Sequence, residues 1–259
     1  MKKLAILGNG FLAGIVVEAA QKGLLPDYEL VGILGRSGEK TRALAGKAGC
    51  AACFSVEELL AAKPDYVAEA ASVAAVRDYA QKILSNGANL AVLSIGAFAD
   101  DAFYRSVAET AKKNGTRVHI ASGAVGGFDV LRTVALMGEA HVTFETHKGP
   151  ASLRNTPLFE EKLMTDEKET RVFEGTAREA IALLPTKVNV AVAASLASVG
   201  PERERVGITS VPGFVGDDHC ITAETGGVKA VVDIYSSTSA IAGWSLVALL
   251  QNLASPIVF

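Results

Sequence analysis

Cysteine is scarce in this chain, and an excess of basic residues is missing. Only 3 of the 259 residues are cysteine, too few for a disulfide framework, so we expect a protein of the reducing cytoplasm. The 25 Lys and Arg residues are outnumbered by 28 Asp and Glu residues, which gives a formal net charge of −3. Such a balance provides no broad basic surface, and we expect no nucleic-acid partner.

The sequence also lacks a secretory signal and a well-formed membrane span. Met1–Lys3 lead into an apolar run of strand length that stops at Gly8, whereas a signal peptide has a longer apolar stretch and a small-residue cleavage site. No charged residue occurs from Ser236 to Phe259, but Gln251, Asn252 and several serines interrupt this segment, and no Lys or Arg cluster flanks it. We therefore expect a helix that is buried or lies in an interface, and no membrane span.

The first half of the chain has the pattern of an α/β fold, in a sequence that is 49% hydrophobic and 20% charged. Short apolar runs of strand type alternate with segments whose apolar residues recur at helical spacing. Five strands are predicted, over Lys3–Leu7, Leu30–Leu34, Tyr66–Ala68, Leu90–Ile95 and Arg117–Ala121. This alternation predicts a Rossmann-type, doubly wound parallel sheet.

The second half has a different pattern, in which apolar and polar residues alternate with period two. Five such runs are Val142–Thr146, Arg171–Glu174, Val206–Val211, Cys220–Glu224 and Val228–Tyr235. Two helices are predicted among them, one from a capping box at Thr176–Glu179 and one over Val190–Ser198. We expect a dinucleotide-binding domain over residues 1–122, a second α+β domain over 123–237, and a C-terminal helix within 238–259 that packs back on the first domain.

A glycine turn follows the first predicted strand and precedes a helix. Gly8-Asn9-Gly10-Phe11-Leu12-Ala13 has the form GxGxxG/A, with Ala13 in the third place. The first glycine permits a tight turn, the second lets the backbone approach a pyrophosphate, and the small third residue lets the helix pack on the strand. In this context the turn predicts a dinucleotide site with contacts from Gly8, Gly10, Phe11, Leu12 and Ala13.

The end of the second predicted strand bears on the choice between NAD and NADP. An NAD enzyme usually carries an acid there to bind the ribose 2′-hydroxyl, but this chain has Gly35-Arg36-Ser37. Arg36 and Ser37 could bind a 2′-phosphate, and no acid would repel it. The alternative is that Arg36 only stacks on the adenine. We favour NADP and leave NAD open.

Four histidines are candidates for proton transfer. His119 falls in a predicted strand and reads as a packing residue, and His141 and His147 stand at opposite ends of another. His219 closes the polar run Gly216-Asp217-Asp218, which predicts a turn before a strand. A histidine there suits proton transfer, and an ordinary surface histidine is the alternative.

Two other patterns read as structural. Cys50-Ala51-Ala52-Cys53 has redox spacing, but it lacks the flanking context of a redox motif. Asp217, Asp218 and His219 are adjacent and cannot easily face one ion, so we expect no metal.

Several segments together resemble the L-aspartate dehydrogenase family over nearly the whole chain. They are Gly8–Ala13, Ser94–Asp100, the glycine-rich Ser122–Asp129, Phe173–Gly175, Lys187–Ala191 and Asp218–His219. The resemblance implies a homodimer that uses NAD or NADP to convert L-aspartate to iminoaspartate. The imine then hydrolyses to oxaloacetate and ammonia, or enters NAD biosynthesis.

The resemblance also implies roles for single residues. The family's catalytic histidine falls on His219, and cofactor contacts fall on Ala124 and Asn189. The two departures are Ala13 for the third glycine and the Gly35–Ser37 segment, where some members carry an acid.

The substrate contacts and the rival functions are less constrained. Lys148 and Arg154 are candidates to bind the two substrate carboxylates, although such residues are more often solvated surface charges. Rival functions are a related two-domain reductase, such as homoserine dehydrogenase or dihydrodipicolinate reductase, and a non-enzymatic NADP sensor. The paired-histidine basic motif expected of dihydrodipicolinate reductase is missing, and a sensor has no use for a titrating group such as His219.

Overall fold

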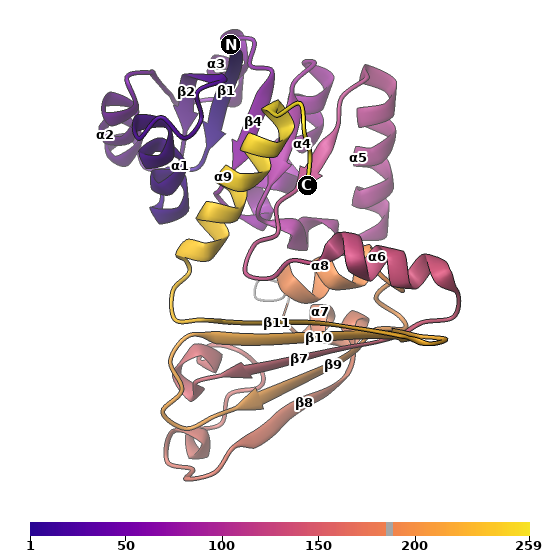
Figure 1. The fold of residues 1–259 in the computed structure, drawn as a ribbon. Coiled ribbons are helices and arrows are strands. Elements are labelled where there is room, and N and C mark those ends of the chain that lie inside the picture. The colour runs from indigo at the N-terminus through magenta and orange to yellow at the C-terminus, as the bar shows by residue number, and fades with distance from the viewer. Residues whose placement is uncertain (185–188) are drawn as a thin grey trace. The chain divides into compact units, whose positions relative to one another are not determined.

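The computed structural model describes residues 1–184 and 189–259, which form two compact units. One unit comprises residues 1–123 together with 240–259, and the other comprises residues 124–239 (Figure 1). The first contains a six-stranded sheet and the second a five-stranded sheet. The predicted fold class, a Rossmann-type parallel sheet with a second α+β part, is confirmed.

The sheet of the first unit is parallel throughout, and its strand order is β3-β2-β1-β4-β5-β6. Its strands are β1 (Lys2–Leu7), β2 (Tyr28–Leu34), β3 (Ala51–Cys53), β4 (Tyr66–Glu69), β5 (Asn89–Val92) and β6 (Val118–Ile120). Leu4, Ala5 and Ile6 of β1 are completely buried, because helices cover both faces of such a sheet. The order reverses between β1 and β4, where a doubly wound sheet binds its ligand.

Helices connect these strands, and most begin at a side-chain cap. They are α1 (Phe11–Gln21), α2 (Gly38–Ala48), α3 (Val56–Ala61), α4 (Val73–Ser85), the short η1 (Ile95–Ala99) and α5 (Asp101–Asn114). The hydroxyls of Ser37, Ser55 and Ser72 cap α2, α3 and α4, and the carboxylate of Asp100 caps α5.

The last helix of the chain, α9 (Ala240–Ala254), belongs to the first unit and packs against α1. Leu246 and Leu250 are completely buried, and a Cβ added to Gly243 would come within 2.6 Å of Ile15. The Tyr28 hydroxyl donates a 2.8 Å hydrogen bond to the carbonyl of Leu250. Within residues 1–184 and 189–259, no helix is long and apolar enough to cross a membrane.

The second unit is built on a mixed sheet with the order β11-β10-β7-β9-β8, in which only β7 and β9 run parallel. Its strands are β7 (His141–Lys148), β8 (Thr170–Thr176), β9 (Arg205–Ser210), β10 (Asp217–Thr225) and β11 (Val228–Ser236). Helices α6 (Phe128–Met137), α7 (Ala177–Leu183) and α8 (Asn189–Ala197) lie on one face of this sheet (Figure 1). The short helices η2 (Pro150–Leu153) and η3 (Glu161–Met164) follow β7.

The alternation predicted for these strands is present in their burial. In β7, Val142, Phe144 and Thr146 are buried and Thr143 is exposed, so one face of the sheet meets the helices and the other meets solvent. The predicted capping box is also present, with Thr176 and Glu179 bonded to each other's backbone at the start of α7.

Two expectations for the first unit were wrong. The sheet has six strands rather than five, because the Cys50–Cys53 segment contributes the short edge strand β3. The strand expected to reach Ile95 ends at Val92. The Leu93 N–H donates to both the carbonyl and the side chain of Glu69, at 3.3 and 3.2 Å, and the Ser94 N–H donates to that side chain at 2.9 Å.

Candidate active site

The glycine turn after β1 requires glycine at its first position. Gly8 has φ +135°, and an added Cβ would lie 2.4 Å from the carbonyl oxygen of Ala70. Its N–H donates to the carbonyl of Leu34 at 2.7 Å. The turn is therefore packed between the ends of β2 and β4, and no side chain fits there.

The N-terminus of α1 differs from those of α2 to α5, because no side chain caps it. Its first residue follows Gly10, which is exposed and has nothing within 4 Å of an added Cβ. Ala13 is completely buried, whereas the Phe11 side chain is 63% exposed. Uncapped N–H groups at a helix start, with open space before them, suit the pyrophosphate of a dinucleotide, so the residues present fit such a cofactor.

The structure brings the Arg36–Ser37 loop to the glycine turn through Asn9. The Asn9 amide donates to the Ser37 carbonyl and to the Thr41 hydroxyl, both at 2.9 Å. Arg36 is exposed, and the Ser37 hydroxyl accepts from the Lys40 N–H at 3.4 Å. The sequence analysis did not predict a role for Asn9, although its place between the two glycines of the turn pointed to the cofactor site.

His219 does not lie in a polar turn, as the sequence suggested, but within β10, where it is 5% exposed. It faces the helix-covered side of the sheet. Its Nδ1 is 2.9 Å from the Thr146 hydroxyl on the neighbouring strand β7, and its ring lies 5.6 Å from that of Phe144. Among the described residues no hydrogen-bond partner is seen for Nε2 of His219.

The surroundings of His219 keep its imidazole neutral. Burial lowers the pKa of His219 to about 4, and the nearby Lys148 ammonium acts in the same direction. Asp217 and Asp218 oppose this shift in pKa. Lys148 is itself ion-paired with Asp217, opposite it on β10. At neutral pH, the His219 imidazole is therefore uncharged and lies near the Lys148 ammonium.

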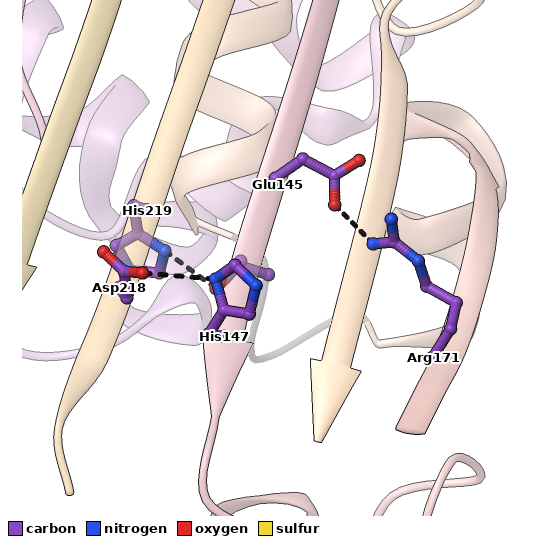
Figure 2. Close-up of polar contacts among 6 residues, drawn as sticks. Glu145, His147, Arg171, Asp218 and His219 are labelled. Atoms are coloured by element: carbon purple, nitrogen blue, oxygen red, sulfur yellow. Dashed lines mark hydrogen bonds and ion pairs between the residues drawn. The ribbon is translucent and has the colours of Figure 1, made fainter. Parts of the chain in front are cut away.

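His147 and His119 lie in different environments from that of His219. His147 lies on the opposite face of the same sheet, where its Nδ1 is 3.1 Å from the Asp218 carboxylate; on that face Glu145 also pairs with Arg171 (Figure 2). The His119 ring packs 6.1 Å from that of Tyr66, and burial lowers the pKa of His119.

The other predicted residues are spread over the second unit. Ala124 lies in the loop before α6, and Asn189 is the first residue of α8, which packs against α6. Arg154 directly follows η2 and is exposed, with its guanidinium 3.8 Å from the Met164 sulfur. Lys187 and Val188 lie outside the described residues.

Neither the cysteines nor the acidic residues form a metal centre in the part of the chain that the structure describes. No three His, Cys, Asp or Glu side chains are grouped there so as to hold an ion. Cys50 and Cys53 are free thiols, and burial raises the pKa of Cys50 to about 11.

Comparisons with family models divide the chain into two stretches. The model described as "Homoserine dehydrogenase, NAD binding domain" matches residues 7–121. The model described as "Aspartate dehydrogenase, C-terminal" matches residues 129–253, a range that includes Lys148 and His219.

Individual proteins resemble the chain along its whole length. The L-aspartate dehydrogenase of Methanococcus maripaludis (strain C5) is 35% identical over 99% of this chain and 98% of its own. That of Methanosarcina barkeri is 34% identical, with the same shares covered. The crystal structure of aspartate dehydrogenase from Thermotoga maritima has a TM-score of 0.79 and 28% identity, and it covers 100% of this chain and 99% of its own.

Proposed function

Since the chain belongs to the L-aspartate dehydrogenase family, we propose that it catalyses the NAD(P)-dependent oxidative deamination of L-aspartate. The product iminoaspartate hydrolyses to oxaloacetate and ammonia, and the reaction is reversible. The likeness along the whole chain carries this proposal. The buried, neutral His219 supports it, because the amino group must lose protons as the imine forms.

The proposed cofactor contacts are those of the glycine turn and two that family membership implies. Gly8, Gly10, Phe11, Leu12 and Ala13 would hold the pyrophosphate, and Ala124 and Asn189 are further contacts that family membership implies. A bound nicotinamide supplies the acceptor for the hydride that leaves the α-carbon of aspartate.

His219 is the proposed proton acceptor. In the tautomer that this role requires, the Nδ1–H donates to the Thr146 hydroxyl, and Nε2 takes a proton from the substrate amino group or from the water that attacks the imine carbon. Lys148 and Arg154 are proposed to bind the two substrate carboxylates. A dicarboxylate bound beside His219 would raise its pKa from about 4 towards neutrality, which improves it as a base.

The substrate is tested directly by the absorbance of the reduced nicotinamide. L-Aspartate should reduce NADP or NAD at alkaline pH, and oxaloacetate with ammonia should oxidise the reduced cofactor. D-Aspartate and L-homoserine are the matched controls, because one inverts the α-carbon and the other lacks the second carboxylate. Turnover of homoserine without turnover of aspartate would replace this proposal with the homoserine dehydrogenase alternative.

Arg36 is proposed to bind the 2′-phosphate of NADP. Arg36→Asp should lower the ratio of kcat/KM for NADP to kcat/KM for NAD by about tenfold or more, because a charge-assisted hydrogen bond is worth about 1.5–3 kcal/mol. Arg42→Asp is the control, since Arg42 is on the next helix and stacks on Phe54 at 4.9 Å. An unchanged ratio in Arg36→Asp would show that this arginine does not touch the phosphate.

Assembly and cellular role follow from family membership. We propose that the protein is a homodimer of the reducing cytoplasm, where its three free cysteines stay reduced. We also propose that its imine product is used before it hydrolyses, and that iminoaspartate is thereby supplied to NAD biosynthesis.

A further inference from the structure

A buried carboxylate lies at the end of β4, where the strand order of the first unit reverses. Glu69 is the last residue of β4, and its side chain is completely buried. β4 pairs with β1 on one side and with β5 on the other. A dinucleotide crosses the C-terminal edge of a doubly wound sheet at this reversal. Glu69 therefore lies at the edge of the sheet that serves the cofactor.

Five hydrogen bonds converge on this one side chain. Its Oε1 accepts from the backbone N–H groups of Ala71 at 2.8 Å and Ser72 at 3.0 Å, and from the Ser94 hydroxyl at 2.8 Å. Its Oε2 accepts from the backbone N–H groups of Leu93 at 3.2 Å and Ser94 at 2.9 Å. All five partners are donors, which suits the acceptor-only carboxylate. Glu69 thus joins the loop after β4 to the loop after β5.

Both loops lead into elements at the cofactor edge. Ser72 caps α4, and η1 begins at Ile95, directly after Ser94. The loop after β4 also packs against the glycine turn, because a Cβ added to Gly8 would lie 2.4 Å from the Ala70 carbonyl oxygen. The Glu69 side chain therefore links two backbone segments at the cofactor edge.

We propose that Glu69 is a positioning residue for the nicotinamide half of the cofactor, an inference that rests on the proposed function. Each half of a doubly wound sheet binds one mononucleotide, and the adenosine ribose is held after β2. The loops after β4 and β5 consequently belong to the half that takes the nicotinamide mononucleotide. Glu69 does not react; it fixes the backbone on which that mononucleotide rests.

The test separates the two halves of the cofactor. Glu69→Gln places an amide NH2 against N–H donors, so only one of the two loops stays held. We expect the Kd for NAD+ or NADP+ to rise about tenfold or more, and the Kd for the adenosine half alone, 5′-AMP or 2′,5′-ADP, to stay within about twofold. Glu58→Gln is the control, because Glu58 accepts the Phe54 N–H at 2.8 Å on the surface of the same unit.

Each other result decides against the inference. An equal rise in both Kd values would show that Glu69 only supports the fold, and unchanged values would show that it does not position the cofactor. If Glu69→Gln does not fold, Ser94→Ala removes one of the five bonds, and an unchanged ratio of the two Kd values would overturn the inference. These titrations need no aspartate, so a wild-type protein that binds cofactor without oxidising aspartate would refute the proposed function alone.

Discussion

Replacing His219 with alanine should lower kcat for aspartate oxidation by about 10²–10⁴-fold, the usual loss when a positioned general base is removed. The Kd of the cofactor, measured by fluorescence titration, should change little. The glycine turn that would hold the pyrophosphate belongs to the other compact unit, and its hydrogen bonds do not involve β10. The two measurements together separate a chemical role of His219 from a structural one.

His147→Ala is the matched control for this variant. His147 stands on the neighbouring strand but on the opposite face of the sheet, bonded to Asp218. Its loss should leave kcat within a few fold. Survival of kcat in His219→Ala would mean that another group accepts the proton, and a joint collapse of kcat and cofactor binding would make His219 structural.

His219→Ala should also change how the free energy of unfolding depends on pH. The pKa of His219 is about 4 in the folded protein, below its ordinary value of 6.5. The unfolded chain therefore binds the proton first, and His219 lowers stability as the pH falls from about 6.5 to about 4. The free energy of unfolding of His219→Ala should lose this part of its pH dependence.

Gly8→Ala and Gly10→Ala should fail in different ways, although both lie in the same turn. Gly8→Ala should lower the free energy of unfolding by about 2–5 kcal/mol, because a Cβ at φ +135° would meet the Ala70 carbonyl at 2.4 Å. Gly10→Ala should stay within about 1 kcal/mol of the wild type, since Gly10 has φ −93° and open space around it.

Gly10→Ala, which should barely change stability, should strongly weaken cofactor binding. The methyl group of Gly10→Ala would enter the space that the pyrophosphate needs, and we expect its Kd for the cofactor to rise about tenfold or more in a protein that is otherwise folded. Denaturant unfolding and cofactor titration of both variants measure the pair. A Gly10→Ala variant that binds the cofactor normally would place the pyrophosphate elsewhere.

Patterns that depend on neighbours in the chain could be read from the sequence. The periods of the strands and helices predicted both sheets. The spacing of Thr176 and Glu179 alone predicted where α7 begins. β3 could not be predicted in this way, because three residues of the sequence Ala-Ala-Cys are too short to show a period.

Features that depend on register between strands could not be read in the same way. Asp217 and Asp218 look like turn residues, but they extend β10 because they pair with Lys148 and His147 on β7. For the same reason the contact of Thr146 with His219 was invisible, as was the convergence of two loops on Glu69. Each joins residues that lie far apart in the sequence.

The return of α9 to the first unit bears on the order in which the protein is made. Residues 1–123 emerge from the ribosome before α9 has been translated. This helix packs on α1, and its Leu250 carbonyl accepts the hydrogen bond of the Tyr28 hydroxyl. Residues 124–239 are continuous, so every residue of the second unit is available before the first unit is whole. A nascent chain that pauses before residue 240 would therefore expose Ile15 and its neighbours, and exposed apolar surface makes an incomplete chain prone to aggregate.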